Sequence, residues 1–458
     1  MSTQALDQAR PIQAPGSVSD LYRAVWRWHF YAGLLVLPFL IILAATGALY
    51  LFRDEIDTLV HADLKQVREQ AVQPLPPIAL VERALAAHPG TAVKFMPASS
   101  PASSAEVTVA TEGNARIAVY LNPYDGRVLG SLPDRGTVMW IVREIHSLAF
   151  LGPVAQGMIE IAGAWSIMLV GTGVYLWWPR GQAGGVVSLR GTPRRRVFWR
   201  DLHAVTGAFV GVVLVFLAAT GMPWSVLWGA KVNEWANGQN FGYPAGVRVA
   251  VPMSDEHLNH IAPTTWSLEQ AKVPESTPPG STAPTGEPIG LDRAVAILDG
   301  LGLHAGYVVN LPRGPRGVYT GSVYPDDLSR QRVVHLDQYS GRPLIDMSYA
   351  DYGPLGRGLE WGINVHLGRE FGLANQLLLL AACLAIIVLS ASGAVMWWKR
   401  RPRGSLGVPP APADRAKLRG VVAILAVGGI VFPLAGLSLV AMLALDRLVT
   451  ARRRTRTA

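Results

Sequence analysis

Long stretches without a charged residue are the feature that most constrains this fold. They cover residues 33–52, 161–178, 204–230, 371–398 and 421–445. A transmembrane helix needs about 20 apolar residues to cross about 30 Å of hydrocarbon. The chain is also 50% hydrophobic and only 16% charged, too apolar for an ordinary soluble enzyme of its length. The sequence therefore predicts an integral membrane protein with four or five transmembrane helices.

Basic residues gather beside these stretches and predict their orientation. Arg23 and Arg27 precede the first stretch, an arginine cluster follows the second, and another basic cluster begins at Lys399. Such clusters are typical of the cytoplasmic side, so the N-terminus is expected inside and the two long loops outside. The net charge of +9 is thus explained by the membrane and not by a nucleic acid partner. The first span lacks a small-residue cleavage site and is expected to be retained.

The predicted fold class is an internally duplicated, all-α membrane bundle of four or five helices with two small α+β periplasmic modules. The predicted segments are an N-terminal segment 1–28, a helix 29–52, a module 53–140, a boundary segment with its helix 141–180, a basic loop 181–202, a helix 203–230, a module 231–360, a second boundary segment with its helix 361–400, a basic loop 401–419, a fifth apolar segment 420–447 and a basic tail 448–458. The fifth segment is either a single span or a re-entrant hairpin broken near Gly428, Gly429 and Pro433, and both paths stay open.

Both outer segments carry the same order of elements. In the first, a helix over 78–87 precedes strands over 106–110 and 117–121 and the turn Tyr124-Asp-Gly-Arg127. In the second, a helix over 291–298 precedes strands over 307–310, 317–324 and 332–337 and the turn Tyr339-Ser-Gly-Arg342. Apolar alternation bounded by turn residues is typical of small α+β modules. Residues 274–288, rich in Pro, Ser, Thr and Gly, are expected to form a surface loop or linker.

The chain repeats itself, and histidines are among the repeated residues. A shift of 174 residues places His29 on His203 and Ala44-Ala-Thr-Gly47 on Ala218-Ala-Thr-Gly221. A shift of 220 places His146 on His366 and Gly173 on Gly393. Ionisable residues at a membrane boundary that face a bundle interior are costly and tend to be functional. Four histidines in register therefore predict ligands rather than incidental interfacial residues.

The predicted topology pairs these histidines. His29 and His203 open outward-running helices at the cytoplasmic edge, whereas His146 and His366 precede inward-running helices at the outer edge. Two imidazoles with no nearby carboxylate or thiolate underfill a zinc site, but haem iron needs only two axial ligands from the protein. The single cysteine, Cys383, lies in an apolar run and is expected to be a core thiol. The sequence thus predicts two bis-histidine haems of b type, since it has no Cys-x-x-Cys-His motif for covalent attachment.

Several residues near the histidines have two readings each. Gly33 and Gly207 follow their histidines by one helical turn, so they either admit a porphyrin plane or serve ordinary helix packing. Arg27 and Arg200 either hold haem propionates or anchor the helices at the cytoplasmic side. The pairs Trp177-Trp178 and Trp397-Trp398 are expected to form interfacial belts.

The helical motifs resemble those of the PepSY-associated transmembrane family. The resemblance rests on Trp28-His-Phe-Tyr-Ala-Gly33, Arg143-Glu-Ile-His146, Gly171-Thr-Gly173 and Trp177-Trp-Pro-Arg180, on a later copy at Asp201-Leu-His203, and on the two turns, which resemble the signature of PepSY modules. It covers roughly residues 20–447. Characterised members of that family include bacterial inner-membrane haem proteins that reduce ferric siderophores in the periplasm, and the resemblance implies that localisation and activity here.

The predicted function is a two-haem electron conduit and ferric-siderophore reductase. A cytoplasmic-side reductase would donate to the His29/His203 haem, and the His146/His366 haem would reduce a ferric siderophore outside, releasing Fe(II). Arg313 and Arg316 either attract an anionic chelate or belong to a solvated loop. Two other functions stay open: a non-redox PepSY protein that binds or regulates a peptidase or envelope partner, and a haem reductase of copper or of a quinone-linked partner.

Overall fold

The computed structural model describes residues 19–113, 115–179, 185–238, 251–262, 264–278 and 287–457. The chain divides into two compact units, called here the first and the second unit. The first unit comprises 1–38, 164–212 and 388–458, and the second comprises 39–163 and 213–387. Most of the predicted N-terminal segment, Arg180 of the arginine cluster and the centre of the predicted linker, residues 279–286, lie outside the described residues.

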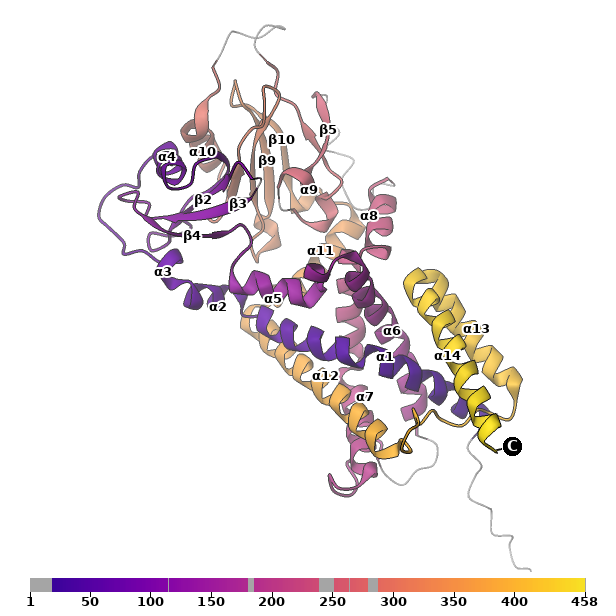
Figure 1. The fold of residues 1–458 in the computed structure, drawn as a ribbon. Helices are drawn as coiled ribbons and strands as arrows, with labels where there is room; N and C mark the ends of the chain where they lie inside the picture. Colours follow the sequence, from indigo (N-terminus) through magenta and orange to yellow (C-terminus); the bar gives the residue numbers. More distant parts are fainter. Residues whose placement is uncertain are drawn as a thin grey trace, which may run out of the picture. The chain divides into compact units, whose positions relative to one another are not determined.

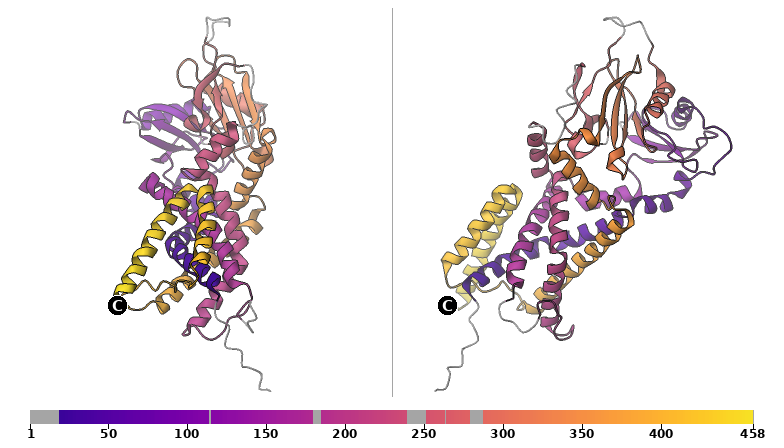
Figure 2. Two further views of the ribbon diagram at one scale, coloured as in Figure 1. Left: turned by 90° about the vertical axis from the view of Figure 1, so that its right-hand side faces the viewer. Right: turned by 180° about the vertical axis from the view of Figure 1, so that it is seen from behind.

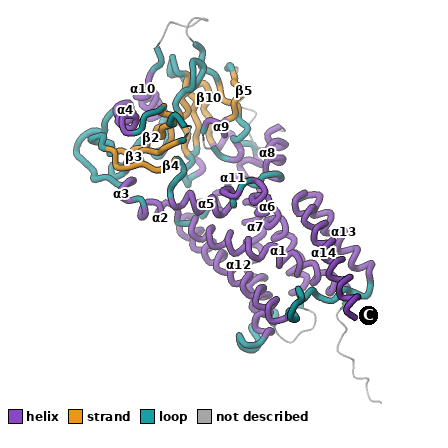
Figure 3. Tube along the Cα trace, in the orientation of Figure 1, coloured by secondary structure: helices purple, strands orange, loops and turns teal. Residues whose placement is uncertain are grey.

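Four long helices account for four of the predicted spans (Figures 1 and 3). They are α1 (Asp20–Tyr50), α6 (Pro153–Trp177), α7 (Arg196–Gly221) and α12 (Gly372–Arg400). Their apolar, uncharged middle parts leave no side chain that needs water, and each helix is long and apolar enough to cross a membrane. A short 3₁₀ turn, η2 (Met222–Trp224), extends α7 and leads to α8 (Trp228–Gly238).

The two segments that precede α6 and α12 are separate short helices rather than parts of the spans. They are α5 (Val138–Ser147), followed by η1 (Ala149–Leu151), and α11 (Pro354–His366). Helix α5 stops because Leu148 adopts a left-handed conformation with φ of 55°, and α11 is followed by Gly368 with φ of 76°. His146 and His366 therefore lie at the ends of short helices, and not within the long ones.

The second unit contains one eight-stranded antiparallel sheet. The strand order is β10-β9-β8-β7-β1-β2-β3-β4. The prediction of two small modules is therefore refined, because β1 pairs with β7 and joins the two halves edge to edge. The strands are β1 (Thr91–Met96), β2 (Ala105–Ala110), β3 (Arg116–Leu121), β4 (Val128–Pro133), β7 (Val308–Asn310), β8 (Val318–Val323), β9 (Arg332–Asp337) and β10 (Pro343–Ser348).

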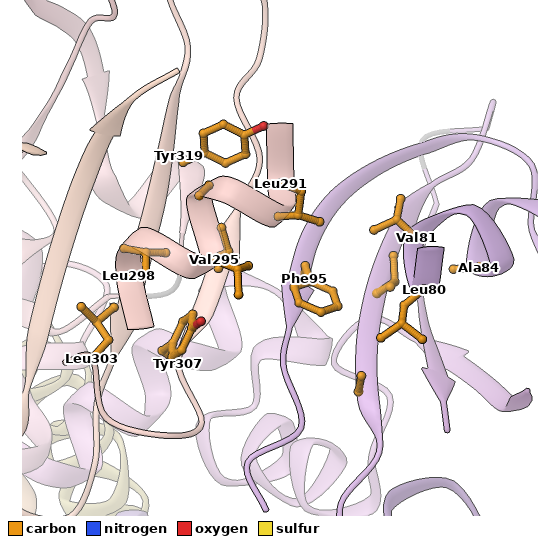
Figure 4. Packing of buried hydrophobic residues seen from close by; sticks show 14 of the residues in the cluster. Leu80, Val81, Ala84, Phe95, Leu291, Val295, Leu298, Leu303, Tyr307 and Tyr319 are labelled. Carbon is orange, nitrogen blue, oxygen red and sulfur yellow. The ribbon is translucent and has the colours of Figure 1, made fainter. Parts of the chain in front are cut away.

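One hydrophobic core spans both halves of this sheet. It is covered by α4 (Pro77–Ala87) and α10 (Gly290–Gly300), which contribute residues such as Leu80 and Leu298 to the same cluster as Phe95 of β1 (Figure 4). The predicted turns are confirmed between β3 and β4 and between β9 and β10, where Gly126 and Gly341 both have φ of 72°. Such left-handed backbone is accessible to glycine at no steric cost.

Shorter elements complete the second unit. A two-stranded sheet, β5 (Met253–His257) with β6 (Lys272–Pro274), and α9 (Leu258–Ile261) share a core cluster with β8, β9 and β10. The remaining elements are α2 (Arg53–Val60), α3 (Ala62–Lys65), η4 (Trp266–Leu268), η5 (Leu328–Arg330) and η6 (Tyr349–Asp351).

The fifth apolar segment folds as a helical hairpin in the first unit. Helices α13 (Arg415–Val431) and α14 (Pro433–Thr457) run side by side (Figure 2). They approach closely because two glycines meet: a Cβ added at Gly429 would lie 2.6 Å from Gly436 Cα. Trp165 Nε1 of α6 donates to Ser438 Oγ of α14 at 2.8 Å. The segment is thus two helices with a break at Phe432–Pro433, and its path relative to the membrane stays a prediction.

Candidate functional site

The first unit brings His29 of α1 and His203 of α7 together. Their ring centroids are 6.4 Å apart, with the ring planes nearly perpendicular at 88°. Two bonds of about 2 Å, the usual length between a metal ion and an imidazole nitrogen, fit between rings at this separation. The structure thus places the predicted partners on two facing helices.

Each ring of this pair is held by a hydroxyl group of a third or fourth helix. His29 Nδ1 lies 2.9 Å from Thr172 Oγ1 of α6. His203 Nδ1 lies 2.9 Å from the Leu389 carbonyl oxygen and 3.3 Å from Ser392 Oγ, both on α12. All four long helices therefore contribute to this pair.

The second unit repeats the arrangement for the other two histidines. His146 Nδ1 of α5 lies 2.8 Å from Thr46 Oγ1 of α1, and His366 Nδ1 of α11 lies 2.8 Å from Thr220 Oγ1 of α7. Burial lowers the pKa of His146 to about 4. Burial, and then the proximity of His146, lower the pKa of His366 to about 3. Both rings are accordingly neutral at pH 7.

The hydroxyl groups determine which ring nitrogen carries the proton. Thr46 donates to the Ile42 carbonyl at 2.6 Å, Thr172 to Met168 at 3.0 Å and Thr220 to Phe216 at 2.7 Å. A hydroxyl whose only proton is donated to its own helix accepts from the imidazole. Nδ1 of all three histidines therefore carries the proton and donates it. His203 Nδ1 donates as well, because a carbonyl oxygen can only accept. In each neutral ring the lone pair is then on Nε2.

A glycine follows each of these hydroxyl residues and lies against the same ring. A Cβ added at Gly47 or at Gly221 would lie 3.6 Å from Cε1 of His146 or His366, respectively. The corresponding distances are 3.4 Å from Gly173 to His29 and 3.5 Å from Gly393 to His203. The four dipeptides, called here the cradles, are Thr46-Gly47, Thr172-Gly173, Thr220-Gly221 and Ser392-Gly393.

The cradles are functional candidates that sequence reasoning missed, although it contained their signal. Thr46-Gly47 and Thr220-Gly221 match at the same shift of 174 residues that relates His29 to His203. Thr172-Gly173 and Ser392-Gly393 match at the shift of 220 that relates His146 to His366. The repeats were noted, but only the fold shows that each cradle meets a histidine from a different part of the chain.

The predicted glycines and arginines have different surroundings. A Cβ at Gly33 would have no atom within 4 Å, whereas one at Gly207 would lie 3.4 Å from Leu389. Arg27 is buried, pairs with Asp446 of α14 and donates to the Pro409 carbonyl. The porphyrin role of the glycines and the propionate role of Arg27 stay predictions.

The other predicted arginines have carboxylate partners. Arg200 pairs with the fully buried Asp201, which also pairs with Arg190. In the second unit, Arg316 pairs with Glu275 and is 69% exposed. Among the other histidines, His335 is fully buried and lies 2.9 Å from Thr320, while His61 accepts from the backbone N–H of Val138.

The donor set favours a cofactor that brings most of its own ligands. Among the described residues, no group of three or more His, Cys, Asp or Glu side chains could hold a metal ion. A structural zinc site takes four protein ligands and a catalytic one takes three. Pairs of neutral imidazoles with free Nε2 lone pairs instead fit haem, whose porphyrin occupies the remaining positions.

No curated protein matches the chain. The family model of the PepSY-associated TM region, however, matches residues 26–400 of the 458 residues. This match includes the four long helices and all four histidines, and the chain is therefore a multi-pass membrane protein that belongs to the PepSY-associated TM family.

Proposed function

We propose that the protein is a two-haem transmembrane electron conduit that reduces a ferric siderophore. His29 with His203 would hold one haem b, and His146 with His366 the other. Haem iron would supply the one-electron chemistry at each site. The protein would carry electrons from a cytoplasmic-side reductase to the periplasm, where reduction to Fe(II) weakens binding by hard oxygen ligands and releases iron for uptake.

One observation carries this proposal: in two pairs of histidines, all four Nδ1 atoms lie within 2.9 Å of a hydroxyl or carbonyl oxygen. The donation from Nδ1 that we infer from this keeps Nε2 free. Histidines that ligate metals almost always donate their other ring N–H to a protein acceptor, which fixes the tautomer and the ring orientation. A histidine that merely fills a membrane core would have no reason to repeat this arrangement four times. The cradles would therefore act as positioning groups for the axial ligands.

A pyridine haemochrome assay on the detergent-purified protein tests the cofactor. We expect about two haems per chain, extractable by acid–acetone because no Cys-x-x-Cys-His motif is present. Purified protein that contains no haem would instead favour a non-redox role for this PepSY protein. If the protein contained haem but reduced copper or a quinone and not ferric chelates, the proposed acceptor would be wrong. The proposed electron conduit would still stand.

The direction of electron flow depends on orientation. Basic clusters at Arg194–Arg196 and Lys399–Arg403 are expected on the cytoplasmic side of a bacterial inner membrane. We therefore expect the eight-stranded sheet in the periplasm. A reporter fused at Gly113, in the exposed turn between β2 and β3, should give a periplasmic signal. A cytoplasmic signal would reverse the proposed flow.

A further inference from the structure

Two arginines of the second unit lie at the chain segment that directly follows His366. Arg53, the first residue of α2, is 8% exposed and donates to the carbonyl oxygen of Leu367, the residue after His366. Arg369, three residues after His366, has a side chain that is 24% exposed. Both guanidinium groups are thus attached to the chain segment that continues from the histidine.

The carboxylates around these arginines compensate their positive charges only in part, because the carboxylates are largely exposed to solvent. Asp326 approaches both, at 3.9 Å from Arg53 and 3.1 Å from Arg369, but its side chain is 64% exposed. Asp54, the other partner of Arg53, is 77% exposed. Arg369 Nε is buried, and its 3.1 Å contact with Asp326 Oδ1 is an ion pair without a hydrogen bond. Burial, and then the charge of Arg53, lower the pKa of Arg369. Two neighbouring cations, one buried and one largely buried, are costly unless an anion compensates them.

We propose that Arg53 and Arg369 form a carboxylate-binding clamp for the two propionates of the haem held by His146 and His366. The inference rests on the proposed function and adds a ligand site to it. Haem propionates are charged and therefore avoid hydrocarbon, so they must leave a membrane haem toward a polar end. Arginine is suited to that end because its planar guanidinium matches a carboxylate with two parallel hydrogen bonds.

The arginines near the other histidine pair differ in this respect. Arg27 and Arg200 already have buried or largely buried carboxylate partners, Asp446 and Asp201. Arg143 offers a matched control within the second unit, because it lies three residues before His146 just as Arg369 lies three residues after His366. Its guanidinium stacks on Trp140, 4.4 Å from the ring centroid, which is closer than the 5.4 Å between Arg53 and the Tyr50 ring. Arg143 is therefore the more fully engaged arginine.

The test compares haem b with its dimethyl ester, which lacks the propionate charges. The full-length chain carrying His203→Ala, which removes a ligand of the other site, is made without haem and titrated in detergent with either compound. Binding is followed by low-spin absorbance. Arg53→Gln and Arg369→Gln should each weaken haem b binding about ten-fold or more, yet bind the dimethyl ester as tightly as the parent protein does. Arg369→Lys should lie between Arg and Gln for haem b.

Each other outcome overturns the clamp. Equal losses for haem b and the ester would mean that the arginines act through folding, and unchanged haem b affinity would mean that they do not contact propionates. A loss selective for haem b in Arg143→Gln alone would move the clamp to that residue. If the parent protein, which carries only His203→Ala, bound no haem, the proposed function itself would be overturned. This result differs from failure of the clamp, in which the parent protein binds haem and the arginine variants do not differ from it as expected.

Discussion

The two histidine pairs have the same kind of hydrogen bond to each imidazole, but they differ in the helices and charged residues that surround them. His29 and His203 lie within long helices, whereas His146 and His366 lie at the ends of short ones. In the first unit, arginines near the pair are neutralised by internal carboxylates such as Asp446. In the second unit, the arginines have mostly exposed partners. The two halves of the duplicated sequence thus share the hydrogen bond to each imidazole, while the charges around each pair are arranged differently.

Removing one histidine from each pair should separate the two sites most strongly. His366→Ala would remove a proposed axial ligand of the second unit, so we expect loss of the proposed haem's low-spin absorbance there and of most ferric-chelate reduction. The other haem should stay reducible. His203→Ala should do the reverse, leaving a chemically reducible haem that a cytoplasmic donor no longer reaches. Loss of both haems from a folded variant, or no spectral change, would show that the pairing is wrong.

The next largest effect concerns the arginine of the first unit. Arg27→Gln removes the ion pair between Arg27 and Asp446 and the donation to Pro409, while Tyr31 still donates to Asp446. Removing one partner of a buried pair costs about 3–5 kcal/mol. The thermal unfolding midpoint should therefore fall markedly. Arg200→Gln is the control, because its side chain is 43% exposed and Asp201 retains Arg190, so we expect less than about 1 kcal/mol. Similar shifts in the two variants would contradict a buried pair.

Removing the cradle hydroxyls should affect the two units unequally. Thr220→Val deletes the hydroxyl acceptor that lies 2.8 Å from His366 Nδ1, and loss of such a second partner typically costs about 10–100-fold in metal affinity. Ser392→Ala should cost less, because the Leu389 carbonyl still accepts from His203 Nδ1 at 2.9 Å. Haem titrations of both variants measure this difference. Equal losses would show that the carbonyl does not support His203.

The smallest effect is expected at the cradle glycines. Gly47→Ala places a Cβ 3.6 Å from His146, an ordinary contact, and removes a helix-interior glycine, so haem affinity should change little and helix stability should rise by up to about 1 kcal/mol. Gly47→Leu should displace the ring and lower haem affinity clearly. If the alanine variant also lost haem, the imidazole would lie closer to α1 than 3.6 Å in the bound state.

Local sequence signals predicted most elements of the eight-stranded sheet and its two helices, but not how they assemble. The two turns, both helices and most of the central strands were predicted because alternation and glycine placement are local properties. Strands β1, β4 and β10 were missed, and so was the pairing of β1 with β7. Edge pairing between residues such as Lys94 and Asn310, more than 200 positions apart, leaves no periodic pattern in either segment.

The same division applies to the candidate site. The sequence by itself determined the apolar spans, the repeat and the four histidines, because hydrophobicity and residue identity are visible at each position. Only the tertiary structure decided which hydroxyl holds which imidazole, that Arg27 meets Asp446, and that Arg53 lies beside Arg369. These contacts join helices distant in the chain, and their distances and proton positions depend on packing. The sequence therefore identifies the four candidate histidines, whereas the neighbouring residues in the folded protein fix the orientation of each imidazole.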